Sequence, residues 1–516
     1  MKKIVIHPVT RIEGHLRVEA VIDNGEVKDA NMSGTLFRGI EMILKGRDPK
    51  DAVMITQRIC GVCPEPHAMA SVGALEEYLG ITDKIPDNAI LVRNIIQATR
   101  TIADHILHFY ILSGLDYIDV SKVLQGNADD EELDILRNAI EQGYTKPFFP
   151  RNEIDYKIDI KTNNEIVSNY LKALDIYRKA QEAATIFGGK WPHDCSIVGG
   201  GISENLTSDK IYSFIWRLKD IENFVKNCYL PDVFAVAKAY DEYTGIGTGC
   251  KNLLAFGSYK IKSNGKYNDF LFAQGLVNDI NKYSNLDIEN ISEEVTHSWF
   301  KDTPPLNPIM GITEPAFDKA EAYSWIKSPR YNNDVYEVGP LASLIATYLS
   351  KENPFLKNLV ETSLSEIGGG ISVLYSVIGR HLARAIMASV LANNLKDWVQ
   401  SLKVGEPASI TYTAPEEGKG IGLWAAPRGA LSHWLNVKEG RISNYQVITP
   451  TGWNASPRDR DGKPGPIEQA LIGLKIKDIE NPIEILRVIR SFDPCLACAV
   501  HLLTPTGRLV SKYKAV

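Results

Sequence analysis

The alternation of apolar and polar residues predicts a β-hairpin near the N-terminus, followed by helices. Residues 16–34 alternate on both sides of a turn sequence at 23–25, which contains Asn and Gly and is typical of a hairpin. Over residues 67–80 the apolar positions recur at helical spacing and end at a glycine. A longer helical period follows over residues 86–110.

The long helix predicted over residues 86–110 also carries polar side chains. Arg93, Arg100, Asp104 and His108 fall opposite its apolar stripe, and Arg100 and Asp104 are one turn apart. Periodicity alone favours a solvated surface for this face.

The rest of the chain is mostly helical, with strands concentrated after residue 403. Residues 125–165 are charged and irregular, which indicates a surface excursion, and residues 245–340 are rich in Gly, Pro, Asn and Tyr, which indicates loops and short strands. Further helices are expected over 166–187, 208–227 and 340–402. The pattern predicts an α+β fold that is predominantly helical.

Composition excludes several classes of protein. The 516 residues are 44% hydrophobic and 23% charged, which is ordinary for a globular chain, and a net charge of -6 without a basic run argues against a nucleic-acid partner. The first residues lack the apolar core of a secretory signal. Residues 371–395 are the most apolar stretch, but Arg380, His381 and Arg384 interrupt it, so a buried or amphipathic helix is expected there instead of a membrane span.

Four of the seven cysteines form two CxxC pairs. Cys60 and Cys63 lie in RICGVCPEPH, and Cys495 and Cys498 lie in DPCLACAVH. An odd and sparse set disfavours a disulfide framework. The remaining cysteines are scattered and are expected to be small buried side chains: Cys195, Cys228 and Cys250.

Each CxxC pair is half of a metal site, since four thiolates can hold one ion. If the pairs converge, the two chain ends meet, and the chain forms one large interwoven domain with a central helix bundle and small peripheral β-sheets around a buried metal site. A structural zinc ion and a four-cysteine iron–sulfur cluster are both chemically compatible with these ligands. The wide separation of the pairs disfavours a local zinc module.

The two cysteine motifs resemble the signature motifs of the large subunits of nickel–iron hydrogenases. Further motifs in family order extend the resemblance along nearly the whole chain: HPVTRIEGHLRVEA, FRGIE, DHILHFY, EVTHSWF, WIKSPRY, EVGPLA, APRGALSHW and TPTGWN. One departure is Pro64-Glu65-Pro66, where better-known members carry small hydroxyl residues, and this puts the subtype in doubt.

The resemblance implies a nickel ion held by all four thiolates. Cys63 and Cys498 would bridge to an iron that carries carbon monoxide and cyanide, while Cys60 and Cys495 would be terminal on nickel. The implied reaction is the reversible oxidation of H2 to protons and electrons.

The resemblance also implies roles around the metals. Cys495 would accept the first proton and Glu13 would relay it, whereas sequence alone equally allows Glu13 to pair with Arg11. Arg428 would lie over the open metal position. The family match places other residues close to this centre, two beside the diatomic ligands (Pro427, Thr451) and two that hold the arginine (Asp104, Asp493). His67 can donate to a bridging thiolate, and its alternative role is that of a hydrogen-bonded core histidine. On this basis the polar face of the long helix is expected to point inward.

A second metal site, usually magnesium, is implied at Glu41, His501 and the backbone carbonyl of Val447. A histidine ligand is unusual for magnesium, which prefers oxygen.

The implied partners follow from the lack of further cysteine clusters that could carry electrons through this chain. The sequence has no further cysteine cluster, so electrons would pass to an iron–sulfur small subunit. The chain would meet a membrane only through partners, and its compartment stays open, either cytoplasmic or exported with the small subunit. Residues 502–516 are expected to be a maturation peptide that an endopeptidase removes after His501, which leaves a catalytic domain of residues 1–501.

Two kinds of related protein have other functions. The quinone-reducing subunits of respiratory complexes lack the full cysteine set that is present here. An H2-sensing regulatory relative would share the metal centre and differ by slow turnover, which sequence does not distinguish.

Overall fold

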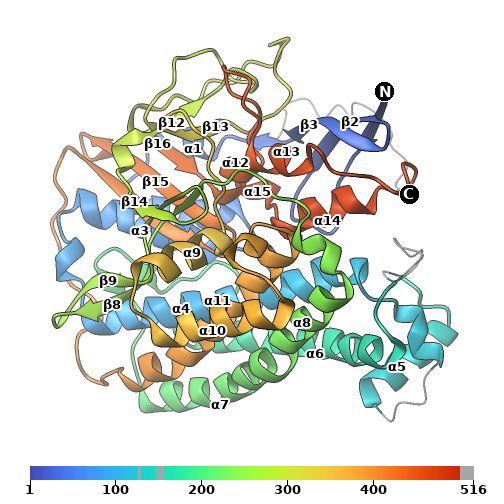
Figure 1. The fold of residues 1–516 in the computed structure, drawn as a ribbon. Coiled ribbons are helices and arrows are strands. Elements are labelled where there is room, and N and C mark those ends of the chain that lie inside the picture. The colour runs from blue at the N-terminus through green and yellow to red at the C-terminus, as the bar shows by residue number, and fades with distance from the viewer. Residues whose placement is uncertain (126–129, 147, 149–155, 500–516) are drawn as a thin grey trace.

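The computed structural model describes residues 1–125, 130–146, 148 and 156–499 and has a predominantly helical α+β fold, as the pattern predicts (Figure 1). The N-terminal hairpin is present: β2 (Leu16–Asp23) pairs with β3 (Glu26–Gly34), and β1 (Lys2–Ile6) adds to the other edge of β2. The turn residues Asn24 and Gly25 both have positive φ, which suits a tight hairpin turn.

Long helices form a bundle in the lower half of the view in Figure 1, where α4 packs on α6 and α11, and α7 packs on α6 and α11. These and the neighbouring helices are α3 (Pro64–Tyr78), α4 (Asp87–Leu107), α6 (Ile160–Gly188), α7 (Ser208–Phe224), α8 (Leu230–Ala239), α9 (Pro340–Ser350), α10 (Pro354–Ile367) and α11 (Val377–Gln400). Among the described residues, no helix combines the length and apolar character needed to cross a membrane.

Side-chain caps explain where several of these helices begin. The side chains of Asp159, Thr207, Asn353 and Ser376 each accept a hydrogen bond from a backbone N–H in the first turn of the helix that follows. Such caps satisfy backbone donors that have no partner inside the helix.

The strands form small sheets around the bundle. One of them is a three-stranded antiparallel sheet formed by residues 418–448 (β14, β15 and β16), and it packs on α3. The remaining strands and short helices have these bounds: β4 (Phe37–Arg38), β5 (Ile197–Val198), β6 (Gly201–Ile202), β7 (Leu253–Ala255), β8 (Ser258–Ser263), β9 (Lys266–Phe272), β10 (Gly275–Asn278), β11 (Lys282–Ser284), β12 (Ile291–Glu294), β13 (Ser328–Tyr331), β14 (Gly418–Ala426), β15 (Gly429–Lys438), β16 (Arg441–Ile448), α1 (Ile40–Leu44), α2 (Asp51–Thr56), α5 (Glu131–Glu141), α12 (Pro450–Asn454), α13 (Pro466–Leu471), α14 (Ile483–Ser491) and α15 (Leu496–Ala499).

Segments from the two ends of the chain lie side by side. In Figure 1 the blue strands β2 and β3 border the red helices α13 and α14, and backbone hydrogen bonds join Val27 to Leu474 and Ile476 to Gly25. Hydrophobic residues from both ends, such as Leu16 and Phe492, belong to the same core cluster. The predicted meeting of the N- and C-terminal motifs is therefore confirmed.

Three sequence-based expectations differ from the structure. Residues 131–141 form the helix α5 within the segment expected to be irregular, and α6 begins at Ile160, six residues before the predicted start. The solvated face expected from periodicity on the long helix is also wrong, because Arg100, Asp104 and His108 are all buried. The inward orientation that the family resemblance implies is correct.

Candidate metal centre

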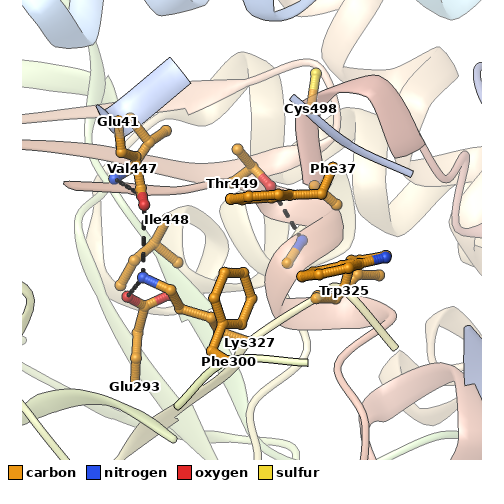
Figure 2. A pocket seen from close by; sticks show the side chains of 13 residues that line it. Phe37, Glu41, Glu293, Phe300, Trp325, Lys327, Val447, Ile448, Thr449 and Cys498 are labelled. Atoms are coloured by element: carbon orange, nitrogen blue, oxygen red, sulfur yellow. Dashed lines mark hydrogen bonds and ion pairs between the residues drawn. The ribbon is translucent and has the colours of Figure 1, made fainter. Parts of the chain in front are cut away.

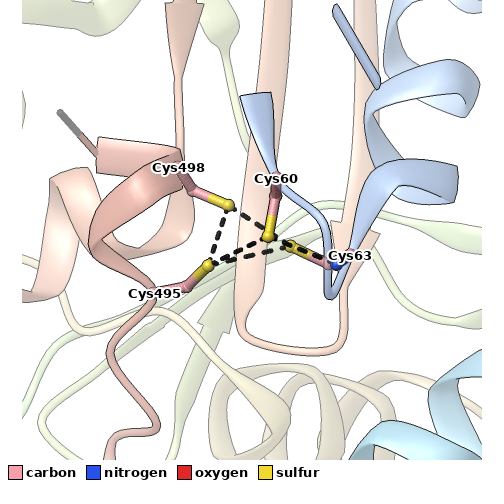
Figure 3. Close-up of side chains that lie close together, drawn as sticks. All are labelled: Cys60, Cys63, Cys495 and Cys498. Atoms are coloured by element: carbon pink, nitrogen blue, oxygen red, sulfur yellow. Dashed lines mark hydrogen bonds between the residues drawn. The ribbon is translucent and has the colours of Figure 1, made fainter. Parts of the chain in front are cut away.

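The four cysteines of the two CxxC pairs converge on one buried point (Figure 3). All four sulfur atoms lie within 4.8 Å of one another. The closest sulfur pairs are Cys495–Cys498 at 3.0 Å, Cys63–Cys498 at 3.2 Å and Cys60–Cys495 at 3.3 Å. This confirms the predicted convergence of pairs that are more than four hundred residues apart in the sequence.

The local backbone structure orients the side chains of the first pair of cysteines. Cys60 ends a short 3-10 helix, and its sulfur accepts the backbone N–H groups of Val62 and Cys63 at 3.3 Å each. Cys63 is the residue before α3, which begins at Pro64, and proline is well suited to a first helical position. The tight turn thus presents both sulfurs toward the same side.

An arginine that the sequence reasoning did not single out joins the two pairs. The Arg38 guanidinium donates to the carbonyl oxygens of Arg58 at 3.1 Å and Ala497 at 2.7 Å, and also to that of Ile59. It therefore links the backbone of both cysteine loops. The motif FRGIE, which contains Arg38, carried the signal, but the sequence does not show which carbonyls this arginine reaches.

Gly14 allows the N-terminal segment to lie against the second cysteine pair. Its φ is +82°, and a Cβ there would be 2.8 Å from both the Ala497 nitrogen and the Leu496 Cβ. Next to it, the Leu496 N–H donates to the Glu13 carbonyl at 2.8 Å. A side chain at position 14 would therefore push the two segments apart.

Glu13 contacts the second cysteine pair directly. Its Oε2 accepts the Ala497 backbone N–H at 2.8 Å and lies 3.2 Å from the Cys495 sulfur, which donates to it. Burial raises the pKa of the Glu13 carboxyl, and the negative charge of Cys60 adds to the rise. The alternative pairing with Arg11 does not occur, because Arg11 pairs with Asp116.

The sulfur cluster has the electrostatics of a ligand set. Hydrogen bonds from Cys495, Cys498 and Cys63 hold the pKa of Cys60 well below its usual value, whereas burial raises the pKa values of Cys495 and Cys498. Four buried thiolates this close would repel one another. A metal cation removes that repulsion, and soft sulfur donors suit nickel and iron, so the residues fit such a centre.

Arg428 lies next to the sulfurs between two acidic side chains. Its Nε is 3.2 Å from Asp493 Oδ2 and its Nη1 is 3.6 Å from Asp104 Oδ2, and the side chain is only 3% exposed. Within the described part of the chain none of its three guanidinium nitrogens makes a hydrogen bond. Burial lowers the pKa of Arg428, but the charges of Asp493 and nearby groups raise it overall, so the guanidinium stays charged.

Asp104 is a buried acid whose pKa is strongly shifted. Burial raises the pKa of Asp104 to about 8, although the charge of Arg428 opposes that rise. Both acids contact Arg428, as the resemblance implies, so the structure brings all three residues together.

A small cavity of about 10 Å³ separates Arg428 from the sulfurs. Its lining includes Pro427, Thr451, Cys63, Cys495 and Cys498. Thr451 is fixed there because its hydroxyl accepts the Cys495 N–H at 2.8 Å. The residues expected beside diatomic ligands therefore surround a space large enough for about one water molecule.

His67 makes a different contact from the expected one. Its Nδ1 lies 3.1 Å from His433 Nε2, and His433 continues to the Tyr445 hydroxyl at 2.7 Å. Among the described residues, no hydrogen bond joins His67 to a cysteine sulfur, although His67 lines the cavity. Burial lowers the pKa of His67 to about 4, so the ring is neutral.

Glu65 accounts for the unusual Pro64-Glu65-Pro66 sequence. It is buried and forms an ion pair with Arg100 of α4, which replaces the Arg100–Asp104 pair that helical spacing suggested. Burial raises the pKa of Glu65 and the Arg100 charge opposes this. Position 65 therefore attaches the first cysteine loop to the helix bundle.

A second polar pocket adjoins Cys498 and Ala499 (Figure 2). It has a volume of about 40 Å³, and Glu41 enters it with Oε1 accepting the Val447 N–H at 2.9 Å. Lys327 Nζ lies 3.6 Å from Glu41 and 3.5 Å from Glu293. Glu41 and Val447 are thus brought together as expected, whereas His501 falls outside the described residues.

The pocket around Glu41 contains residues that the sequence reasoning missed. Lys327 also donates to Gln446 Oε1 at 2.8 Å, and burial raises the pKa of Glu293 to about 7. The motif WIKSPRY pointed to Lys327, but only the fold shows that this lysine faces Glu41.

The scattered cysteines lie apart from the cluster. Cys250 is buried as expected, Cys228 is partly buried, and Cys195 is exposed, so the expectation for Cys195 is wrong. Cys195 follows the segment at Gly188-Gly189 where α6 ends, and that loop is at the surface.

Comparison with protein families gives matches over nearly the full chain. A family described as nickel-dependent hydrogenase matches residues 38–501, and one described as HoxL-like matches residues 3–35.

Curated proteins of similar sequence include three hydrogenase large subunits. The quinone-reactive Ni/Fe-hydrogenase large chain of Wolinella succinogenes is 35% identical over 99% of this chain and 98% of its own length. The periplasmic NiFeSe hydrogenase large subunit of Desulfomicrobium baculatum is 38% identical over 97% and 95%, and the hydrogenase-2 large chain of Escherichia coli is 37% identical over all of both chains.

Solved structures give the same match at the level of the fold. The Ni-Fe-Se hydrogenase of Desulfovibrio vulgaris Hildenborough in its as-isolated oxidised state superposes with a TM-score of 0.87 and 38% sequence identity, covering 97% of this chain and 100% of that one.

Proposed function

Because this chain belongs to the nickel-dependent hydrogenase family and is the large, catalytic subunit of a nickel–iron hydrogenase, we propose that Cys60, Cys63, Cys495 and Cys498 ligate the nickel and that Cys63 and Cys498 also reach the iron. The enzyme is an oxidoreductase that acts on H2. Membership of this family overturns the zinc and iron–sulfur interpretations of the four cysteines.

One observation carries the proposal: the small cavity next to Arg428 lies on one side of the four cysteine sulfurs. Cys63 and Cys498 are 3.2 Å apart and line the cavity below Arg428 together with Cys495, whereas Cys60 does not line it. An iron with small ligands needs such a space on one side of the sulfurs. When bound, the nickel–iron centre supplies heterolytic cleavage of H2.

Proton removal is the step that this chain's own residues perform. The Cys495 sulfur holds a proton 3.2 Å from Glu13 Oε2 and passes it to that oxygen. The Ala497 N–H stabilises the carboxylate before transfer, and the raised pKa of Glu13 brings its proton affinity closer to that of a thiol. Glu13 is therefore the first carboxylate of the proton path.

The cavity suits carbon monoxide and cyanide on the iron. The three unbonded guanidinium nitrogens of Arg428 are donors for a cyanide nitrogen, and Pro427 provides an apolar wall. Asp104 and Asp493 keep the guanidinium in place.

Glu41 is proposed as a ligand of a magnesium ion, together with His501 and the Val447 carbonyl. The pocket supports a cation site because it has carboxylate oxygens from Glu41 and Glu293. In this structure the Lys327 ammonium lies 3.6 Å from Glu41 and 3.5 Å from Glu293, so these oxygens already face a positive charge.

Electrons leave through another chain. Large subunits of hydrogenases pair with a small subunit, and an iron–sulfur small subunit is proposed as the acceptor here. In support, the four clustered cysteines are the only group of three or more potential His, Cys or carboxylate metal ligands among the described residues.

The function is tested by metal content together with turnover. Purified holoenzyme is expected to contain nickel, with iron in excess over nickel because the small subunit carries iron–sulfur clusters, and to reduce a viologen dye continuously under H2. Nickel-loaded enzyme that binds H2 but turns over slowly would instead indicate an H2 sensor. Zinc in place of nickel would contradict the proposal.

The mature chain is expected to end at His501. Cys498 and Ala499 line the pocket at Glu41, and the predicted cleavage site comes two residues after Ala499 in the sequence. Removal of residues 502–516 by an endopeptidase would free this end to close the site, and the domain would then comprise residues 1–501. Intact-mass measurement of active, nickel-loaded enzyme tests this, and an active chain that retains residues 502–516 would refute it.

A further inference from the structure

A cavity of about 470 Å³ lies away from the metal centre, between α3, α4, the β8–β9 hairpin and β14. Ligand-binding pockets typically have volumes of this order. Hydrogen oxidation uses none of its lining residues.

Two buried hydrogen-bond donors in the cavity wall have no acceptor among the described residues, the Nε of Arg93 and the indole N–H of Trp424. The ammonium of Lys260, which is only partly buried, belongs to the same wall, and no described residue accepts a hydrogen bond from it. Arg93 and Trp424 are 5% and 4% exposed, so water does not readily replace the missing acceptors. A buried donor without an acceptor costs about 1–3 kcal/mol.

Three carboxylates also line the cavity, and one of them forms an ion pair with Arg93 through nitrogens other than Nε. Glu76 is held by two hydrogen bonds from the other nitrogens of Arg93, at 2.7 and 3.1 Å. Glu77 accepts the Ile421 backbone N–H, and Asp83 is exposed at the rim. Burial lowers the pKa of Lys260, while Glu76 partly offsets this.

The rest of the wall is apolar. Met69 and Val72 of α3, Ile90 of α4, Phe270 of β9 and Leu423 of β14 provide it. The two sides approach closely because Gly422 lies against α3, where a Cβ would be 1.7 Å from the Ala70 carbonyl oxygen. The cavity thus combines donors with a hydrocarbon surface.

We propose that this cavity binds a small amphipathic carboxylate. Its carboxylate accepts from Lys260, Arg93 and Trp424, and its hydrocarbon body packs on Met69, Val72 and Phe270. A cationic ligand is disfavoured because the buried unpartnered polar atoms in the wall, Arg93 Nε and the Trp424 indole nitrogen, are both donors. The bound ligand would bridge α3 and β14 and so stabilise the folded protein.

The test is calorimetric titration of octanoate into the purified holoenzyme. Saturable binding is expected, with 1-octanol about tenfold weaker and octylammonium not binding, and the melting temperature should rise with octanoate. Absence of saturable octanoate binding at millimolar concentration, or octylammonium binding as tightly as octanoate, would overturn the proposal.

Variants locate the site. Lys260→Met keeps the length of the side chain, removes its charge and should weaken octanoate binding about tenfold, whereas Lys266→Met on the exposed start of β9 should leave it unchanged. Met69→Trp should weaken binding by filling the cavity. Viologen reduction under H2 confirms that each variant is folded. Equal octanoate affinity in Lys260→Met and Lys266→Met would contradict the assignment.

Discussion

Replacing Glu13 by Gln is expected to lower H2 oxidation and H2 evolution by about 100- to 10,000-fold while nickel and iron stay bound. Glutamine keeps the shape of the side chain and can still accept the Ala497 N–H, but it cannot take the proton that Cys495 donates. Viologen-coupled turnover together with metal analysis measures the effect.

Glu19→Gln on β2 is the matched control, because Glu19 pairs with Lys3 and Arg17 away from the sulfurs. It should retain turnover. If Glu13→Gln turned over at the rate of Glu19→Gln, the proton path would have to start at another group.

Arg428→Lys is expected to assemble with its metals and to lose about 100- to 1,000-fold in turnover. Lysine keeps a positive charge between Asp104 and Asp493 but lacks the planar set of donors that faces the cavity. The loss should appear in kcat at saturating H2, with infrared bands of the cyanide ligands shifted because a donor has been removed.

Arg330→Lys provides the comparison for a purely structural arginine. Arg330 is equally buried and bonds Asp459 at 2.7 Å, but it does not line the cavity. This change should lower thermal stability and leave the turnover of metal-loaded enzyme intact. Full activity in Arg428→Lys would reduce Arg428 to a similar structural role.

The features that the sequence predicted are those with a local or a paired signal. The hairpin followed from the turn at Asn24-Gly25, and the convergence of Cys60 and Cys63 with Cys495 and Cys498 followed because each pair is an incomplete ligand set. The contact of Glu13 with Cys495 could be predicted only from the family resemblance, because no local sequence pattern indicates a contact between residues 482 positions apart.

Other features depend on contacts that no local pattern encodes. Periodicity indicated a solvated polar face for α4 because the partners of that face come from distant segments. These partners are Glu65 for Arg100, Arg428 for Asp104 and the Arg490 carbonyl for His108. The link that Arg38 makes between the cysteine loops and the approach of Lys327 to Glu41 are likewise properties of the folded chain.

Anomalous X-ray scattering at the nickel, iron and zinc absorption edges, from crystals of the holoenzyme, tests the central claim most directly. The account predicts nickel among the sulfurs of Cys60, Cys63, Cys495 and Cys498, with iron displaced toward the cavity that Arg428 and Pro427 line. Zinc at the four sulfurs, or iron on the side of Cys60 away from that cavity, would contradict it.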